Sequence, residues 1–265
     1  PLTGARHLAW LGDDLWAVSG DGLVRSAGGE LPWRRLGLDA GRVAAIAADD
    51  GLLWLVLDDG QVARLPSPPC SSPFAPTAGP GTTTLAEPRG LAASPAGWFV
   101  VADSFRHRVS WYRDDGACLD AWDGSEGDLG ELREPSGVAL ARDGRLAVAD
   151  TWNGRILVRQ RDGRVEVVGR ELYGPRDLTW SADGGLLVAD TGNRRLLRFE
   201  PPSWEARVVA RFEAAIVGLA WSGDLVAVAS PEAGDVVLLD PSDGRVVRRL
   251  VVPGWSARQP QEGYL

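Results

Sequence analysis

The sequence predicts an all-β fold, a six-bladed β-propeller with four antiparallel strands in each blade, and three observations support it. One pattern recurs six times along the 265 residues at the spacing of a propeller blade. Each copy holds short runs of β-forming residues that end at Asp-Gly or Gly-Gly pairs, the usual turns of antiparallel hairpins. No stretch has the periodicity of a long amphipathic helix. A propeller accounts for all three, because its blades close into a ring and hide most strand edges.

Three copies of the pattern are closely alike and three are weaker. The close copies run over 87–109, 134–156 and 174–196, and the weaker ones over 7–19, 42–58 and 217–230. The second strand of each copy ends at an equivalent position, 39 to 47 residues after the previous one: Ser19, Asp58, Asp103, Asp150, Asp190 and Ser230. This spacing predicts blades at 5–38, 41–77, 87–123, 134–170, 174–212 and 214–252.

The runs 144–150 and 155–159 show how strands follow each other within one copy, since both are rich in β-forming residues and are bounded by turn pairs. Tryptophan is abundant, with 12 residues, and most of them lie inside such runs. We expect six of these to fill the spaces between blades: Trp16, Trp54, Trp98, Trp111, Trp180 and Trp221.

The chain is expected to form one domain over 1–265, because 45% apolar residues suffice for a single large core. It contains no methionine, even at position 1, so we expect it to be part of a longer polypeptide. It has no run of about 18 apolar residues and no signal-peptide pattern, so membrane insertion by this segment is not expected. Nothing in the sequence indicates a cellular location.

The repeated motif resembles the NHL repeat family. The resemblance rests on Pro135-x-Gly137, Gly144, Val148-Ala-Asp-Thr-x-Asn153, Arg155 and Ile156, and on the connector at 127–132. It is closest over 87–200 and fainter over 214–252 and 1–77. Arg106 replaces the asparagine of the pattern, and blade 6 has Pro231-Glu-Ala-Gly234 instead of the usual turn. The resemblance implies a six-bladed propeller.

A second, shorter resemblance concerns the Pro-Gly-rich stretch 70–81 and the motif at 87–92. These look like propeller-bearing proteins encoded with phage-tail-like contractile injection systems of high-GC bacteria. The resemblance implies a structural or adhesive part of a large assembly.

Several polar residues recur in blade after blade, so a structural role is predicted for them. Aspartates that end the second strand can accept N–H groups of the following turn, asparagines tolerate a left-handed position, and arginines that open the third strand can pair with a carboxylate. The residues in this repeat motif are Asp103, Arg108, Asp150, Arg155, Asp190, Asn193 and Arg195.

Residues that vary at the same loops are better candidates for function. In such blades the turn after the second strand and the start of the first strand lie on one face, which we call the top face. Aromatic and arginine side chains there are typical anchors of protein interfaces. The predicted partner-binding residues are Arg89, Phe105, Arg106, His107, Trp152, Asn153, Arg176 and Arg194, with Glu87, Glu134 and Ser136 on the same face. The alternative for Phe105 and Trp152 is that their rings fold back onto a neighbouring blade.

A protein partner, or another domain of the same polypeptide, is the expected ligand of a non-enzymatic scaffold. The first alternative is a propeller lyase or lactonase-like hydrolase acting in the central cavity of the top face. Only two histidines, His7 and His107, are present, so a three-histidine zinc site cannot form. The run 123–128 lacks the ligand spacing of an EF-hand, and no nucleophile motif occurs. No catalytic residue, metal or cofactor is therefore predicted.

Binding of single-stranded RNA is the second alternative. Arg89, Arg106, Arg176 and Arg194 could form a local basic patch. The formal net charge of -8 opposes nucleic-acid binding, so it is not expected. The two cysteines, Cys70 and Cys118, lack metal-ligand spacing and could be separate thiols or a disulfide between blades.

Overall fold

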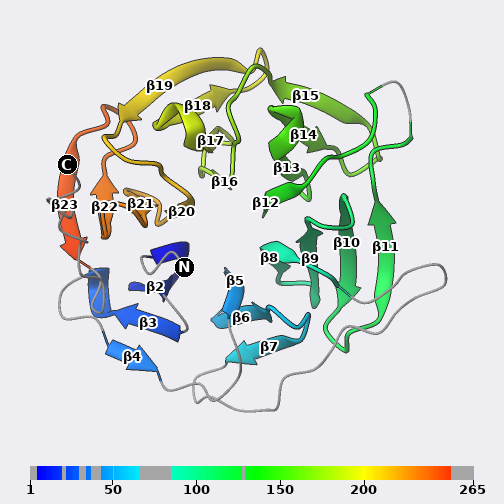
Figure 1. Ribbon diagram of the computed structural model, residues 1–265, viewed down its shortest axis with the longest axis horizontal. Helices are drawn as coiled ribbons and strands as arrows, with labels where there is room; N and C mark the ends of the chain where they lie inside the picture. Colours follow the sequence, from blue (N-terminus) through cyan, green and yellow to red (C-terminus); the bar gives the residue numbers. More distant parts are fainter. Residues whose placement is uncertain are drawn as a thin grey trace, which may run out of the picture.

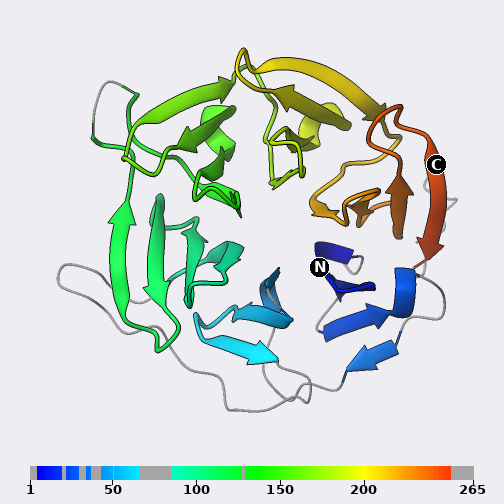
Figure 2. The ribbon, with the colours of Figure 1, turned by 180° about the vertical axis from the view of Figure 1, so that it is seen from behind.

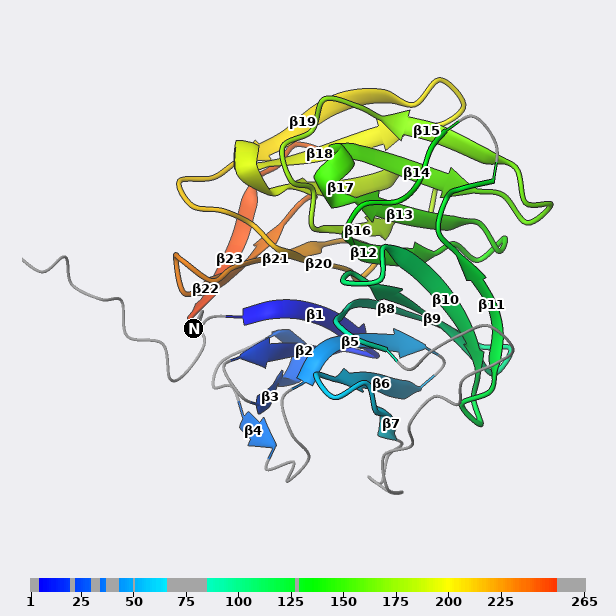
Figure 3. The ribbon, with the colours of Figure 1, turned by 45° about the vertical axis from the view of Figure 1, so that its right-hand side comes forward.

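The computed structural model describes residues 5–19, 22–29, 34–36, 43–49, 51–65, 85–126 and 129–251. Six antiparallel sheets stand in chain order around a central channel (Figure 1). Figure 2 shows the ring from behind, and Figure 3 shows it turned so that the depth of the blades is visible. The predicted fold class, an all-β six-bladed propeller, is confirmed.

Each sheet is one blade, and its strands pair in chain order. Blades 1 to 3 contain β1 (Ala5–Leu11), β2 (Asp14–Ser19), β3 (Gly22–Ser26), β4 (Arg34–Leu36), β5 (Val43–Asp49), β6 (Leu52–Leu57), β7 (Val62–Leu65), β8 (Pro88–Ser94), β9 (Trp98–Asp103), β10 (Arg108–Arg113) and β11 (Cys118–Trp122). Blades 4 to 6 contain β12 (Pro135–Leu140), β13 (Leu146–Asp150), β14 (Arg155–Arg159), β15 (Val165–Gly169), β16 (Asp177–Trp180), β17 (Leu186–Asp190), β18 (Arg195–Glu200), β19 (Glu205–Arg211), β20 (Gly218–Trp221), β21 (Val226–Ser230), β22 (Asp235–Leu239) and β23 (Val246–Val251).

Five of the described sheets have four strands, and blade 2 has three. The rest of the range predicted for blade 2, 66–77, lies outside the described residues. Helical structure in the described part of the chain is limited to the 3-10 turns η1 (Ala27–Gly29), η2 (Thr151–Asn153) and η3 (Thr191–Asn193). No helix among these residues has the length and apolar character of a membrane-spanning segment.

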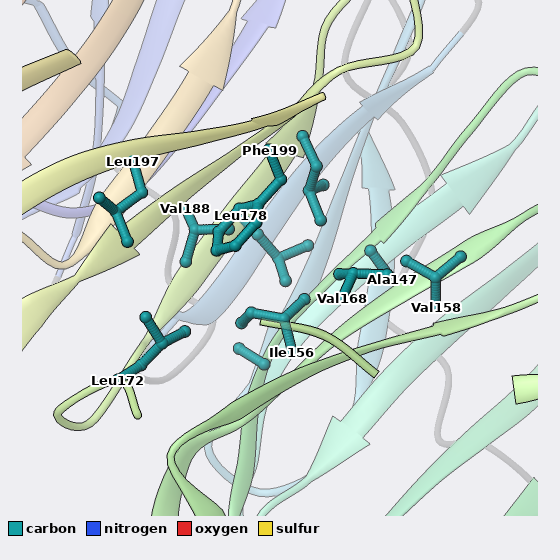
Figure 4. Packing of buried hydrophobic residues seen from close by; sticks show 11 residues of the cluster. Ala147, Ile156, Val158, Val168, Leu172, Leu178, Val188, Leu197 and Phe199 are labelled. Atoms are coloured by element: carbon teal, nitrogen blue, oxygen red, sulfur yellow. The ribbon is translucent and has the colours of Figure 1, made fainter. Parts of the chain in front are cut away.

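Apolar side chains pack between neighbouring blades. Between blades 4 and 5, Ile156 and Val158 of β14 belong to one cluster with Leu178, Val188 and Phe199 of blade 5 (Figure 4). Full burial of each large side chain of this kind contributes about 1.5–3 kcal/mol. The prediction for the strand tryptophans is confirmed, since all six lie in strands and in inter-blade clusters: Trp16, Trp54, Trp98, Trp111, Trp180 and Trp221.

The ring closes where blade 6 meets blade 1. Leu8 and Val24 of blade 1 pack in one cluster with Val236 and Leu238 of blade 6, and the Arg248 guanidinium donates a hydrogen bond to the carbonyl oxygen of Gly29 at 3.1 Å. Every sheet in the described part of the chain consists of consecutive strands, so no strand is shared between these two blades. The closing interface therefore depends on side-chain packing, like the interfaces between the other blades.

Candidate binding site on the top face

The loops of the top face are fixed by buried carboxylates that end the second strands. In blade 4, Asp150 Oδ2 accepts hydrogen bonds from Arg155 Nε at 2.6 Å and from Asn153 Nδ2 at 2.8 Å. Asp150 Oδ1 accepts one from the backbone N–H of Arg133 at 2.7 Å. The Arg155 guanidinium also donates to the carbonyl oxygens of Gly130 and Glu131. One carboxylate thus ties the connector, the turn and the third strand together.

Blade 5 repeats this network with different residues. Asp190 accepts hydrogen bonds from Arg195 Nε at 2.6 Å, from Asn193 Nδ2 at 2.9 Å and from the backbone N–H of Tyr173 at 2.8 Å. In blade 3, Asp103 binds the backbone N–H groups of Ala86 and Glu87. These contacts support the structural role predicted for the recurring residues.

Two details of that prediction were wrong. The carboxylates accept N–H groups of the connector that precedes the first strand, not of the turn that follows the second strand. The left-handed position is not the asparagine but the residue after it: Gly154 with φ 58° and Arg194 with φ 51°. The side-chain amides of Asn153 and Asn193 instead donate hydrogen bonds to Asp150 and Asp190, and these bonds hold the asparagines in a right-handed turn.

Three large aromatic side chains are exposed on the top face of consecutive blades. Phe105 and Trp152 occupy the same loop position in blades 3 and 4 and are 70% and 61% exposed. Gly192 holds this position in blade 5, and the ring of Tyr173 packs over it. Tyr173 is 69% exposed. We call Phe105, Trp152 and Tyr173 the aromatic arc.

Several predicted partner-binding residues are engaged within the protein. Asn153 donates its amide to Asp150 and to the carbonyl oxygen of Glu131. Arg106 lies 3.6 Å from the buried carboxylate of Asp103. His107 has φ 54°, and its Nδ1 accepts a hydrogen bond from the backbone N–H of Glu134 at the start of blade 4. These side chains position loops and neighbouring blades.

Arginines flank the aromatic arc. The guanidinium of Arg133 lies 5.6 Å from the ring centroid of Trp152, within the range of a cation–π contact. Arg194 is exposed and donates to the carbonyl oxygen of Glu213 at 3.0 Å. This part of the top face combines apolar rings with positive charge.

The other predicted arginines, Arg89 and Arg176, lie at the top end of the central channel. Together with Arg6 they line a cavity of about 90 Å³, whose remaining walls are His7, Ser136 and Val217. Arg89 forms a bifurcated ion pair with Glu87, at 3.1 and 2.6 Å. Arg6 donates to the carbonyl oxygen of Val43 at 3.4 Å. We call the cavity between these three arginines the channel mouth.

Electrostatics at the channel mouth are dominated by positive charge. Burial, together with the charges of Arg6 and Arg176, lowers the pKa of His7 to about 3, so this imidazole is neutral at pH 7. The pKa of Arg176 is lowered by partial burial and by the charge of Arg89, while Glu134 acts in the opposite direction. Within the described residues, the Arg176 guanidinium has no hydrogen bond or ion pair.

Asp177 lines a second cavity in the channel, with a volume of about 190 Å³. Its Oδ1 accepts the backbone N–H of Leu178 at 2.9 Å, and its Oδ2 accepts that of Leu219 in blade 6 at 2.8 Å. Burial nevertheless raises the pKa of Asp177 to about 7. The side chain joins blades 5 and 6 and holds a proton for part of the time near neutral pH.

No group of three or more His, Cys, Asp and Glu side chains that could hold a metal ion occurs in the described part of the chain. Cys118 is half-buried, with its Sγ 3.7 Å from the carbonyl oxygen of Asp120, and Cys70 lies outside the described residues.

The sequence interpretation missed Tyr173, Arg6 and Asp177. Arg6 could have been found by extending the repeat alignment to blade 1, because 5–9 matches 88–92 with arginine in the second position. The same alignment places His7 and Asp177 where blades 3, 4 and 6 have glycine. Tyr173 comes from a connector outside the aligned motif, so no repeat position marked it.

Comparison with known proteins agrees with this architecture. Residues 132–158 match the NHL repeat family model, which together with the six blades supports an NHL-type propeller. No curated protein sequence matches the chain.

Solved structures with similar folds have diverse functions. A streptogramin B lyase structure has a TM-score of 0.69 at 12% identity, covering 94% of this chain and 83% of that one. Virginiamycin B lyase from Staphylococcus aureus, in a catalytically inactive form with quinupristin, has a TM-score of 0.65 at 15% identity, covering 95% and 85%. A chain of a nidogen/laminin complex has a TM-score of 0.74 at 17% identity, covering 90% and 92%. At these identities the likeness shows the fold alone.

Proposed function

We propose that this propeller is a non-enzymatic binding module that docks a protein partner across its top face. The observation that carries the proposal is the aromatic arc, whose Phe105, Trp152 and Tyr173 are 70%, 61% and 69% exposed on three consecutive blades. Large exposed apolar patches mark interaction sites, and aromatic residues often dominate the binding energy of an interface. The arc offers three such anchors on one face.

The charges beside the arc favour a partner segment that carries acidic as well as apolar side chains. Arg133 and Arg194 flank the arc on a chain whose formal net charge is -8. An acidic segment would be repelled by most of the surface and attracted at this face. Charge patterns of this kind give specificity and orientation more than affinity.

The fold and the resemblances fit a binding role. A propeller of similar fold occurs in a nidogen/laminin complex, so this architecture is compatible with protein binding. We place the partner in another protein or in another domain of the same polypeptide. The resemblance of 70–81 and 87–92 to proteins of phage-tail-like systems favours a large assembly as the setting.

Substitution of the central residue of the arc tests the proposal. Trp152→Ala should weaken partner binding by about 2 kcal/mol, because a buried interface tryptophan is a typical hot spot. Its melting temperature should stay near that of the wild type, because the ring is exposed. Binding would be measured by calorimetry with a partner captured from the source organism on the immobilised wild-type chain.

Leu119→Ala is the matched control, since Leu119 is 54% exposed outside the top-face loops. It should leave binding unchanged. A lowered melting temperature with intact binding in Trp152→Ala would assign the ring to folding. If single Ala substitutions of all three arc residues leave binding intact, the partner uses another surface.

An enzyme acting in the channel is the second candidate, favoured by the raised pKa of Asp177, about 7, inside a cavity. Propellers of similar fold include streptogramin B and virginiamycin B lyases. Incubation with quinupristin, followed by chromatography, distinguishes the two candidates. If the protein is a binding module, the chromatographic retention of quinupristin should not change. Conversion of quinupristin that is lost in Asp177→Asn would support the enzyme.

A further inference from the structure

Arginines from three blades converge at the channel mouth although they are far apart in sequence. Arg6 comes from blade 1, Arg89 from blade 3 and Arg176 from blade 5, so they alternate around the ring. Glu87 pairs with Arg89, and Glu134 acts on Arg176. The pKa of His7 is nevertheless lowered by burial and by the charges of Arg6 and Arg176, and this effect of the two arginines indicates a positive potential at the channel mouth.

The positive charge of these arginines cannot be removed by deprotonation. A buried lysine or histidine can lose its proton, as His7 does here with its pKa of about 3. Arginine remains charged at every physiological pH. The guanidinium of Arg176 has no hydrogen-bond or ion-pair partner in the described ranges, although its donors lie in the wall of the cavity. The side chain of Arg176 is exposed, so an anion from the solvent can reach these donors.

We propose that the channel mouth is a binding site for a small oxyanion, a carboxylate or phosphate group, held by Arg176 and Arg89 with Arg6 on the opposite side. The inference goes beyond the proposed function, because it does not require the aromatic arc to bind a protein. An anion here would be attracted by the positive charge and would accept hydrogen bonds from Arg176.

The size and chemistry of the cavity limit the ligand. A volume of about 90 Å³ holds several water molecules, and therefore the head of one oxyanion. Planar guanidinium groups match the two oxygens of a carboxylate or phosphate edge with parallel hydrogen bonds. The hydroxyl of Ser136 is 2.6 Å from Thr151 Oγ1, which itself donates to the carbonyl oxygen of Pro175. Ser136 therefore shapes the wall, and the arginines supply the donors.

Titration of the full chain with inorganic phosphate tests the site, with sodium acetate as the carboxylate probe. The signals of the arginine Nε–H groups are followed by nuclear magnetic resonance at constant ionic strength. We expect saturable shifts for a single site. Arg176→Gln keeps a polar side chain but shortens it and removes its charge, and it should weaken binding about tenfold or more. Tighter binding of phosphate than acetate indicates a phosphate ligand, and the reverse order indicates a carboxylate.

Arg164→Gln is the matched control. Arg164 pairs with the carboxylate two residues before it, Asp162, as Arg89 pairs with Glu87, but it lies in the loop between β14 and β15. The affinity of Arg164→Gln for phosphate and acetate should stay within about twofold of the wild type, since the lost charge is remote from the channel mouth. Absence of saturation, or equal losses in both variants, would overturn the proposal. If Arg176→Gln does not fold, Arg89→Gln replaces it with the same expected loss.

Discussion

Individual residues of the top face divide into those that hold loops and those that face solvent. Asp150 and Arg155 belong to the first group, since their contacts join a connector, a turn and a strand. Trp152, between them in sequence, belongs to the second. A short loop thus contains both roles at neighbouring positions.

The buried ion pair of blade 4 should be essential for stability. Arg155→Ala would leave the carboxylate of Asp150, which is 0% exposed, without its charged partner. Removal of one partner from a buried pair costs about 3–5 kcal/mol. Urea denaturation would show this loss in the free energy of unfolding, while Arg164→Ala, at an exposed pair, should change it by less than about 1 kcal/mol. Equal effects would contradict the structural role.

Asp177 should make stability depend on pH between 4 and 8. Its pKa is raised from 3.8 to about 7 in the folded protein, so the folded state binds the proton more tightly. The resulting stabilisation is complete below the unfolded pKa and is lost as pH rises through 7, with an upper limit of about 4 kcal/mol.

Comparison with Asp177→Asn isolates this contribution, because the amide does not titrate. The free energy of unfolding of the wild type should fall relative to that of the variant as pH rises from 4 to 8. His7 titrates in the unfolded state of both proteins, so its effect cancels. A difference independent of pH would show that Asp177 has an ordinary pKa.

At the scale of the strand, the inner strands depend on glycine where blades begin. A Cβ at Gly90 would lie 2.1 Å from the carbonyl oxygen of Ser136 in the next blade. Gly90→Ala should therefore force the two inner strands apart and lower the melting temperature by well over about 2–4 °C, the shift that about 1 kcal/mol causes in a large domain.

Gly163→Ala is the control for this substitution. Gly163 has φ 89° and no atom within 4 Å of an added Cβ, so alanine meets only backbone strain there. It should cost about 1 kcal/mol. Calorimetry of both variants measures the difference, and a milder effect at Gly90 would mean that the blades can separate without loss.

The repeat explains which elements could be predicted. Strand order and blade number follow from the recurrence of aspartate and serine at the ends of second strands. The hydrogen-bond partners of Asp150 were harder to foresee, because the acceptor can reach either flanking segment. The aromatic arc was predicted only in part, since Tyr173 belongs to a connector. Its ring packs over Gly192, which has no side chain at the loop position of Phe105 and Trp152. The convergence of Arg6, Arg89 and Arg176 could not be predicted, because only the closed ring brings these residues together.

At the scale of the whole molecule, the weakest point of the ring should be the interface between blades 6 and 1. Leu238→Ala would remove a buried side chain from this interface and should cost about 2–5 kcal/mol. Hydrogen exchange should accelerate mainly in β1 and β20. Leu157→Ala, in the interface of blades 3 and 4, is the matched control and should not preferentially expose β1 and β20. Identical exchange patterns would show that the ring opens as one unit.

Since blades 6 and 1 share no strand within the described residues, their packing also bears on the order in which the protein folds. Neighbouring blades are adjacent in sequence, so five of the six interfaces can form as soon as the next hairpins leave the ribosome. The cluster that contains Leu8 and Leu238 must wait until blade 6 has been synthesised. Until then blade 6 does not cover the apolar side of blade 1, and we expect this side of the nascent chain to be prone to aggregation.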